Sequence, residues 1–503
     1  MFKRSSGIIL HPSSLPGPDG IGDLGPEAFR FINFLAETGC SLWQVLPLGP
    51  TGYGDSPYQC FSAFAGNPYL VSPALLLEAG LLARSELADR PVFPDHKVDY
   101  GPVIQWKVNL LQKAYTHFRQ SAPASIKTAF KAFQEAEAFW LPDFALFMAI
   151  KQSQGGVAWG NWPISLRQRD PATLEAFRKD HKEQIQQHTF SQFLFYQQWA
   201  AIKTYANEKG IRVIGDIPIF VAYDSSDAWS HPELFYLSDK GQPTAVAGVP
   251  PDYFSPTGQL WGNPLYRWNI HKKQEFSWWI ERVKANLKLY DILRLDHFRG
   301  FAKYWEVPAG KPTAEVGRWA PGPGAAFFKA IEKALGSLPI IAEDLGEITP
   351  DVIALRDQFN LPGMKIFQFA FASDSHDPFL PHNYTANCVA YTGTHDNDTS
   401  LGWYRSATPK EQDFIRRYLA RSGDDISWDM MRAVWASVAM FALAPMQDLF
   451  SMPTEARMNF PGKPAGNWQW RLMPNALNTG LLERIHEMNQ VYSRDALEKP
   501  KEK

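Results

Sequence analysis

The sequence predicts an α/β fold, a (β/α)8 barrel (TIM barrel) with large insertions after strands 2 and 3 and no C-terminal β-domain. Short apolar runs recur along the 503 residues, end in small or polar residues and are followed by helical patterns. Their apolar character is continuous rather than alternating, which is typical of parallel strands buried on both faces. The runs span residues 7–14, 42–50, 211–220, 291–298, 339–346, 364–371, 388–396 and 445–450. Eight strand–helix units in one long chain indicate the barrel.

The helices expected between these strands carry recognisable ends. Residues 26–39 open with proline near the first helical position and close on glycine, the order that helix termini prefer. Residues 349–359 begin with a threonine N-cap, a proline and an acidic first turn, and residues 408–420 repeat that start. Residues 276–290 lead into the fourth strand.

An open, doubly wound sheet is the alternative arrangement of the same elements. It is disfavoured because no G-x-G-x-x-G follows the first strand and no G-x-x-x-x-G-K-[ST] occurs in the chain. In a barrel the active site lies at the carboxyl ends of the strands, so functional residues are expected there.

Two segments between predicted strands are too long for a simple strand–helix loop. Residues 51–205 contain several amphipathic helices and are expected to form a mainly helical insertion. Residues 222–275 are rich in proline, glycine and aromatic residues. The catalytic barrel then comprises residues 1–50 and 206–503. Both insertions leave the carboxyl ends of strands and should wall the active site, while residues 451–503 are too few for a separate β-sandwich.

Composition indicates a globular protein and disfavours several classes of partner. Hydrophobic residues make up 45% and charged residues 20% of the chain, with a net charge of −2. No basic patch or acidic tail is visible, so nucleic acid and membranes are not expected as partners. The three cysteines lie far apart without C-x-x-C spacing, against a disulfide framework or a zinc site. Without a signal-peptide pattern or an apolar span, we expect a cytoplasmic protein.

Carboxylates stand at or near the ends of four predicted strands, at Asp216, Asp296, Glu343 and Asp396, and the eighth run adds Asp448. Any one of them alone would be explained as a helix N-cap or a loop salt bridge. Four on one rim are harder to explain, because converging like charges cost free energy unless some protonate or a ligand shares the field. Glycoside chemistry uses such a set as nucleophile, acid/base and transition-state stabiliser. Divalent metal binding is the competing use.

Sequence context separates the roles of these carboxylates. Arg294 lies two residues before Asp296, on the same side of the strand, so its guanidinium should keep Asp296 ionised with a low pKa, as a nucleophile requires. An ordinary strand-end ion pair is the alternative. Glu343 ends the apolar stretch PIIAE, which favours the protonated form that an acid needs. His395, beside Asp396, is placed to donate to a sugar hydroxyl.

Longer stretches in this order resemble a known family. Arg-x-Asp on strand 4, Glu after strand 5 and His-Asp after strand 7 resemble the signature regions of the α-amylase superfamily. The wording resembles the 4-α-glucanotransferases (amylomaltases or disproportionating enzymes, glycoside hydrolase family 77) over nearly the whole chain. The stretches are HPSSLPGPDGIGDLG, WQVLPLGPTGYGDSPYQ, GVPPDYFSPTGQLWGNP, LRLDHFRG, AEDLG, YTGTHDND and PTEARMNFPGKPAGNWQWR.

The resemblance implies Asp296 as nucleophile, Glu343 as acid/base and Asp396 as transition-state stabiliser. It also implies a substrate-binding set. These residues are Arg294 and His395 in subsite −1, Asp216 on the first signature region, Ser56 and Tyr58 lining the donor site, and Asn467 near the site. The implied reaction moves a segment of a 1,4-α-glucan to the 4-hydroxyl of glucose or another 1,4-α-glucan. It proceeds by a retaining double displacement through a covalent glycosyl–Asp intermediate and can also cyclise long glucans.

The implied partners are maltooligosaccharides, amylose or other 1,4-α-glucans, with a monomeric protein and no cofactor. The sequence departs from ordinary α-amylases, which carry a histidine five residues after the aspartate of strand 3, where this chain has Val221. It also lacks a calcium loop of the D-x-[DN]-x-[DN]-G type, so no metal is expected.

The loop at residues 245–264 is a candidate lid over the acceptor subsites. A transferase must hold its acceptor at high effective molarity and keep water from being activated. The loop offers prolines and glycines for shape, and the candidate substrate-binding residues Asp252, Tyr253, Phe254 and Trp261. The alternative is a surface loop whose aromatics only anchor it to the barrel.

Two other functions remain open from the sequence. One is an α-glucan hydrolase of the α-amylase type; the other is a catalytically inactive glucan-binding protein, which would be expected to lack one of the three catalytic acids. Tyr53 and Tyr100 are candidates for an outlying glucan-stacking platform, with core packing or chance as the alternative.

Overall fold

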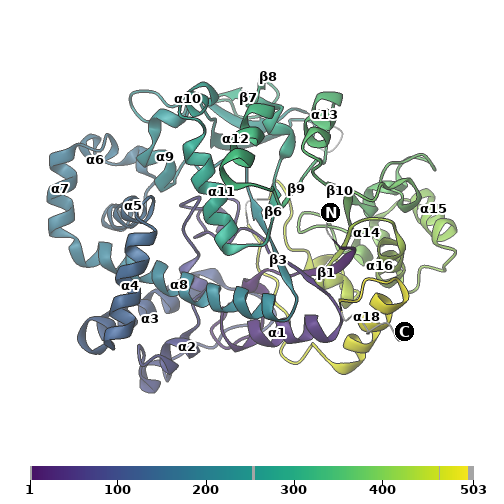
Figure 1. The fold of residues 1–503 in the computed structure, drawn as a ribbon, viewed down its shortest axis with the longest axis horizontal. Coiled ribbons are helices and arrows are strands. Elements are labelled where there is room, and N and C mark those ends of the chain that lie inside the picture. The colour runs from purple at the N-terminus through teal and green to yellow at the C-terminus, as the bar shows by residue number, and fades with distance from the viewer. Residues whose placement is uncertain (1–2, 252–254, 464, 497–503) are drawn as a thin grey trace.

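The computed structural model describes residues 3–251, 255–463 and 465–496, and a closed barrel of eight parallel strands forms its centre (Figure 1). The strands follow the order β1-β12-β11-β10-β9-β6-β3-β2 around the barrel. Their bounds are β1 (Ser5–Ile9), β2 (Leu42–Gln44), β3 (Arg212–Ile217), β6 (Ile292–Leu295), β9 (Ile340–Ala342), β10 (Gly363–Ile366), β11 (Cys388–Tyr391) and β12 (Phe441–Pro445). The predicted fold class is therefore confirmed.

Seven of these strands overlap predicted runs, but the prediction for the eighth is wrong. Residues 445–450 start at the last residue of β12 and continue as the short helix α17 (Met446–Leu449). The strand itself is the preceding stretch FALAP, buried at all five positions. It follows closely on helix α16 (Ile426–Ala436), so one long apolar stretch holds a helix and then a strand. Hydrophobic periodicity does not separate the two within such a stretch.

Helices follow the barrel strands and cover the outside of the barrel. The helices predicted from their caps are confirmed, and α15 has the full capping box between Thr408 and Glu411. The remaining bounds are α1 (Pro26–Glu37), α9 (Ser226–Ser230), α10 (Trp268–Lys273), α11 (Ser277–Leu289), α12 (Ala325–Leu335), α13 (Pro350–Gln358), α14 (Ser400–Ser406), α15 (Pro409–Leu419) and α18 (Thr479–Val491).

The chain between β2 and β3 forms a set of helices that lies to one side of the barrel (Figure 1). They are α2 (Pro73–Glu78), α3 (Tyr100–Ser121), α4 (Ala124–Ala136), α5 (Leu141–Ser153), α6 (Ile164–Arg167), α7 (Pro171–Asp180) and α8 (Lys182–Glu208). The last of them packs against α3, α4 and α5 and also against β3, and it is one continuous helix across residue 205. Helix α8 therefore joins this helical part to the barrel without a linker.

A second, antiparallel sheet with the order β5-β4-β7-β8 stands beside the barrel. Its strands are β4 (Ala245–Val249), β5 (Gln259–Pro264), β7 (Lys303–Pro308) and β8 (Arg318–Pro321). The candidate lid loop thus contributes the β4–β5 hairpin, and its β4 pairs with β7 from the segment that follows β6. Sequence patterns did not predict β7 or β8. The hairpin is consequently anchored to the segment directly downstream of Asp296.

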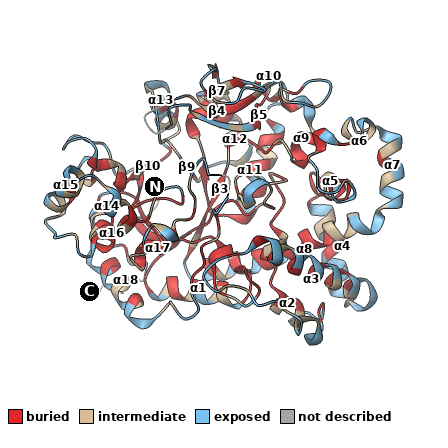
Figure 2. Ribbon diagram, turned by 180° about the vertical axis from the view of Figure 1, so that it is seen from behind, coloured by how far each residue is buried: buried red, intermediate tan, exposed pale blue. Residues whose placement is uncertain are grey.

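The barrel interior is filled by apolar side chains from all eight strands, and buried residues concentrate on the strands (Figure 2). Members include Ile9, Leu42, Ile214, Ile292 and Leu443. Each such side chain contributes about 1.5–3 kcal/mol when fully buried. On β3, the ring of Tyr290 lies 2.1 Å from where a Cβ of Gly215 would stand, so only glycine fits next to Asp216.

No helix among the described residues is long and apolar enough to cross a membrane.

Candidate active site

Four acidic side chains reach the carboxyl end of the barrel from four different strands. Asp216 lies near the end of β3, and Asp296, Glu343 and the His395–Asp396 pair follow β6, β9 and β11. The backbone registers these ends against one another: the amide of Asp296 donates to the carbonyl of Ile217 and that of Glu343 to the carbonyl of Leu295. The parallel barrel therefore brings together carboxylates that are far apart in the sequence.

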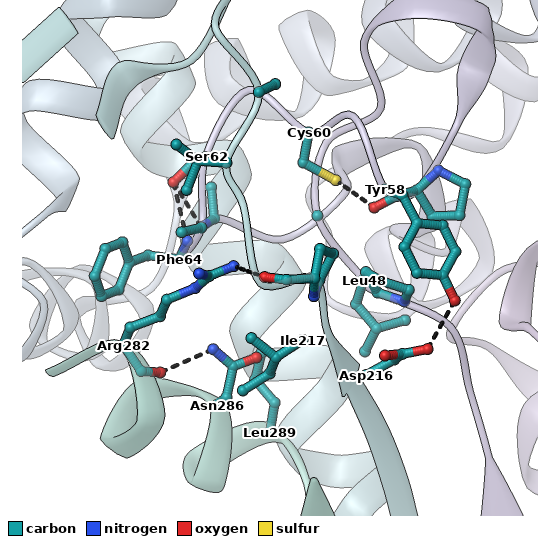
Figure 3. A pocket seen from close by; sticks show the side chains of 18 of the residues that line it. Leu48, Tyr58, Cys60, Ser62, Phe64, Asp216, Ile217, Arg282, Asn286 and Leu289 are labelled. Carbon is teal, nitrogen blue, oxygen red and sulfur yellow. Dashed lines mark hydrogen bonds between the residues drawn. The ribbon is translucent and has the colours of Figure 1, made fainter. Parts of the chain in front are cut away.

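Arg294 is the buried cation at the base of this group. Its Nη1 lies 2.6 Å from Oδ2 of Asp216 and 3.0 Å from Oδ1 of Asp296. The side chain of Asp216 is fully buried, and the hydroxyl of Tyr58 donates to the same Oδ2 at 2.7 Å (Figure 3). One guanidinium thus bridges strands β3 and β6, and the expected contact between Arg294 and Asp296 is present.

The expected low pKa of Asp296 is not found. Burial raises the pKa of Asp296, the carboxylates of Asp216 and Asp396 act in the same direction, and Arg294 lowers it, with a net pKa of about 6. The ion pair is real, but Arg294 is shared with Asp216 and does not offset the loss of water. Asp296 therefore ionises close to neutral pH rather than well below it.

Glu343 is held by the residue that follows Asp296. The backbone N–H of His297 donates to Oε2 of Glu343 at 2.6 Å, and His297 has a left-handed backbone with φ of 52°. This conformation is uncommon outside glycine, and it occurs at the residue whose N–H binds the carboxyl group. Burial raises the pKa of Glu343 well above its usual value, as does the charge of Asp296, while Arg294 and the His297 N–H lower it. Glu343 is consequently protonated more readily at neutral pH than an ordinary glutamate.

Asp396 has the opposite electrostatic character. Its side chain is 47% exposed, with Oδ2 lying 3.4 Å from Nε2 of His395 and Oδ1 accepting from Nδ2 of Asn459 at 2.6 Å. Partial burial raises the pKa of Asp396, but His395, Asn459 and Arg294 together bring it well below its usual value. The three acids are therefore shifted differently: the pKa of Asp396 lies below its usual range, that of Asp296 is raised to about 6, and that of Glu343 is raised well above its usual value.

Comparison with known proteins shows to which family the chain belongs. A family model described as 4-alpha-glucanotransferase matches residues 10–477. The chain belongs to the 4-α-glucanotransferase family. It is an enzyme of the glycosyltransferase class. This membership disfavours the two alternative functions, an α-glucan hydrolase and an inactive glucan-binding protein.

Named relatives cover the chain from end to end. A 4-alpha-glucanotransferase of Thermus thermophilus is 52% identical over 98% of this chain and 99% of the relative. The chloroplastic/amyloplastic 4-alpha-glucanotransferase DPE1 of Arabidopsis thaliana is 44% identical over 98% of this chain and 86% of its own length. An amylomaltase from Streptococcus agalactiae, solved in complex with acarbose, superposes with a TM-score of 0.95 at 41% identity, over 98% of this chain and 100% of that one.

In this glucanotransferase-family chain, Tyr58, His395 and Trp468 form an aromatic wall beside the acids. Tyr58 stacks on His395 with ring centroids 5.1 Å apart, and Trp468 lies 5.9 Å from His395. Ser56 supports this wall from below, because its Oγ accepts from the backbone N–H of Tyr58 at 3.2 Å. The buried Asn467 uses its side chain inside its own loop, accepting from the N–H of Phe460 and donating to the carbonyl of Lys463.

The candidate lid meets the site through Trp261 on β5. Its ring lies edge-on to that of His297, with centroids 4.8 Å apart. Asp252, Tyr253 and Phe254 lie outside the described residues. The hairpin therefore contacts the side chain of His297, the residue that follows Asp296 and whose N–H binds Glu343.

A pocket with a volume of about 50 Å³ lies beside Asp216 (Figure 3). Cys60, Val221 and Tyr290 are among its lining residues. Burial raises the pKa of the Cys60 thiol to about 12, which keeps it neutral. Oδ1 of Asp216 has no hydrogen-bond partner among the described residues and is buried.

Asp448 and the tyrosine pair lie apart from the cluster of acids. Asp448 is fully buried on α17 and accepts hydrogen bonds from Thr392 and from both the N–H and the hydroxyl of Ser400. It braces the loop that carries His395 and Asp396 instead of facing the cleft. Tyr53 is 78% exposed, whereas Tyr100 is 8% exposed and donates to the carbonyl of Trp468. The two tyrosines therefore do not present a shared exposed platform.

Two functional contacts escaped the sequence analysis, and both come from the segment after α17. Asn459 reaches the carboxylate of Asp396, and Arg457 donates to its backbone carbonyl. In the sequence, this stretch is marked only by its resemblance to the family, because no periodicity or spacing links residue 459 to residue 396. Within the described chain, no group of three or more His, Cys, Asp or Glu side chains is arranged to hold a metal ion.

The buried Arg294–Asp216 pair generates a stability prediction. Arg294→Met should lower the free energy of unfolding by about 3–5 kcal/mol, because it leaves the fully buried Asp216 without its cation. Adding Asp216→Asn should cost less than the sum of the two single changes, by roughly 1–3 kcal/mol of coupling. Chemical denaturation of the four proteins measures this cycle.

The matched control for this cycle is Arg318→Met. Arg318 pairs with Glu306 at 2.8 Å but is 76% exposed, so its loss should change stability by less than about 1 kcal/mol. Strict additivity of Arg294→Met and Asp216→Asn would contradict the bridging role of Arg294.

Proposed function

We propose that this enzyme transfers a segment of a 1,4-α-glucan to the 4-hydroxyl of glucose or of another 1,4-α-glucan by a retaining double displacement. The observation that carries the proposal is the separation of pKa values among Asp296, Glu343 and Asp396 around one buried guanidinium. A retaining glycoside reaction needs one ionised carboxylate and one protonated carboxyl group at the same site. The family membership and the superposition on an amylomaltase in complex with acarbose support it.

In the proposed first step, Oδ of the ionised Asp296 attacks the anomeric carbon and forms a glycosyl ester. Glu343 gives its proton to the leaving glycosidic oxygen, so the shortened glucan departs as a neutral alcohol. In the second step Glu343, now a carboxylate, takes the proton of an acceptor 4-hydroxyl, and that oxygen displaces Asp296. Asp396 stays ionised throughout and stabilises the oxocarbenium-like transition states.

We propose that Arg294, His395, Asp216, Ser56 and Tyr58 shape the donor subsite. Arg294 orients Asp296 and offsets part of its charge, while Tyr58 and His395 provide a stacked wall for the sugar face. Asn467 contributes by closing the loop that carries Trp468. Maltooligosaccharides and amylose fit these residues, and a long glucan whose own end reaches the acceptor side would be cyclised.

We further propose that the β4–β5 hairpin covers the acceptor side and favours sugar over water. Water is about 55 M as the bulk liquid, so transfer requires an ordered acceptor and exclusion of activated water. The contact between Trp261 and His297 supports this placement, because it puts an indole beside the residue that directly follows Asp296. We also propose that the enzyme is cytoplasmic and acts as a monomer. Light scattering of the purified protein tests the monomeric state.

Maltotriose distinguishes transfer from hydrolysis. The wild-type enzyme should convert it to glucose and longer oligosaccharides while the total of reducing ends stays constant, because each bond broken is replaced. Asp296→Asn should abolish both products, and Glu343→Gln should reduce the rate by roughly 10²–10⁴-fold. Chromatography of the products together with a reducing-end assay measures both quantities, and a steady rise in reducing ends would contradict the proposal.

The pH dependence follows from the two titrating acids. Asp296 must be ionised to attack, so kcat/KM should fall as the pH drops through about 6, by roughly tenfold per unit at the lower end. Glu343 must be protonated in the first step, so the alkaline limb reports its raised pKa. Initial rates with maltotriose between about pH 4.5 and about pH 9 give the profile. Full activity maintained a unit below 6, with the fold intact, would contradict the assignment of Asp296.

The lid proposal predicts a change in the partition of the intermediate. Trp261→Ala should raise the ratio of hydrolysis to transfer on maltotriose, because water gains access to the ester. Leu260→Ala is the matched control, since Leu260 is the adjacent residue of β5 and is 39% exposed. An unchanged ratio in Trp261→Ala, or an equal rise in both variants, would contradict the lid.

A further inference from the structure

Asn459 holds the carboxylate of Asp396 from outside the barrel. Its Nδ2 donates to Oδ1 of Asp396 at 2.6 Å, the shorter of the two polar contacts that this carboxylate makes. The side chain of Asp396 is 47% exposed, so close packing does not fix its rotamer. Hydrogen bonds must hold the carboxylate in place, and Asn459 supplies the shorter one, a charge-assisted bond to an ionised acceptor.

The position of Asn459 is itself set by its target. Its backbone N–H donates to the carbonyl of His395 at 3.1 Å, and its carbonyl accepts from Nε of Arg457 at 2.6 Å. Arg457 also donates to the carbonyl of Asp396, and its guanidinium lies over the ring of Phe460 at 4.7 Å. The segment from Arg457 to Phe460 therefore binds the main-chain carbonyls of His395 and Asp396, and the side-chain amide of Asn459 binds the carboxylate of Asp396.

The groups that face Asp396 define what Asn459 adds. His395 approaches Oδ2, Arg294 and Arg457 supply positive charge, and Asp296 and Tyr58 lie close enough to interact with it electrostatically. The cations act on the carboxylate as a whole. Asn459 donates to one defined oxygen, Oδ1, and so fixes the orientation of the carboxyl plane relative to the cleft.

We propose that Asn459 is a positioning residue for the transfer reaction, which holds Asp396 ionised and correctly oriented toward the reacting sugar. The inference rests on the proposed role of Asp396. Asn459 acts through Asp396 and needs no contact with the substrate. A residue with only a structural role in the loop would alter stability without changing the pH profile of catalysis.

The test uses Asn459→Asp and Asn459→Ala in the full-length enzyme with maltotriose as substrate. Asn459→Asp is nearly isosteric and replaces the donor by a second carboxylate against Oδ1 of Asp396. Two carboxylates in contact share a proton, so Asp396 then titrates at a higher pH. The added negative charge also lies near Asp296, whose ionisation sets the acid limb, so that limb of kcat/KM should move to higher pH, and loss of the donor should lower activity near neutral pH roughly 10- to 100-fold.

Asn459→Ala removes the donor without adding charge. It should lower kcat roughly 10- to 100-fold with little change in KM, because the lost interaction matters chiefly in the transition state. The matched control is Asn387→Asp. Asn387 precedes β11 at the opposite end of the strand and donates to Asn360, and its exchange should leave kcat and the pH profile unchanged.

The outcomes separate this inference from the function on which it rests. Activity retained in Asp396→Asn would remove the role of Asp396 and with it the proposed function. If Asp396→Asn is inactive but Asn459→Asp follows the wild-type pH profile, Asn459 does not position Asp396 and the inference alone is overturned. An equal shift in Asn387→Asp overturns it as well. Should Asn459→Ala not fold, the pH profile of Asn459→Asp decides the question.

Discussion

The buried guanidinium of Arg294 is the interaction on which the rest of the site depends. A cation that is 4% exposed at the centre of a barrel costs several kcal/mol of desolvation unless carboxylates surround it. Asp216 meets most of that requirement at 2.6 Å, and this leaves Asp296 paired but incompletely neutralised at 3.0 Å. The same arrangement that stabilises the barrel therefore raises the pKa of Asp296 to about 6, because Arg294 serves two acids and burial acts on both. Stability and chemistry are set by one shared charge.

Around that centre, the other two acids are placed by the main chain. Glu343 accepts a hydrogen bond from the backbone N–H of His297, a residue with a left-handed backbone. Asp396 depends on a segment more than sixty residues downstream, where Arg457 and Asn459 bind its carbonyl and its carboxylate. The barrel fixes the strand ends, but loops from elsewhere in the chain determine where the carboxylate oxygens point.

The strand ends explain why much of the site was predictable. Asp216, Asp296, Glu343 and Asp396 each follow a continuous apolar run, and a parallel barrel brings such ends together. The pKa of Asp296 was not predictable, because spacing shows that Arg294 is near but not that Asp216 shares it. Strand β12 was misplaced because it continues an apolar helix, and β7 and β8 form only by pairing with the β4–β5 hairpin. Asn459 had no local signal, since its function lies in one long-range hydrogen bond.

On the proposed roles, the site is electrostatically unbalanced before substrate binds. With Glu343 protonated, the carboxylates of Asp296 and Asp396 both lie near Arg294, which is shared with Asp216, and positive charge on the sugar would improve the balance. An oxocarbenium-like transition state does so, because charge develops at the anomeric carbon between Asp296 and Asp396. Formation of the ester then removes the charge of Asp296, while proton transfer leaves Glu343 anionic. The negative charge thus moves from Asp296 to Glu343. The net charge of the acids near Arg294 is therefore the same before the second displacement as before the first.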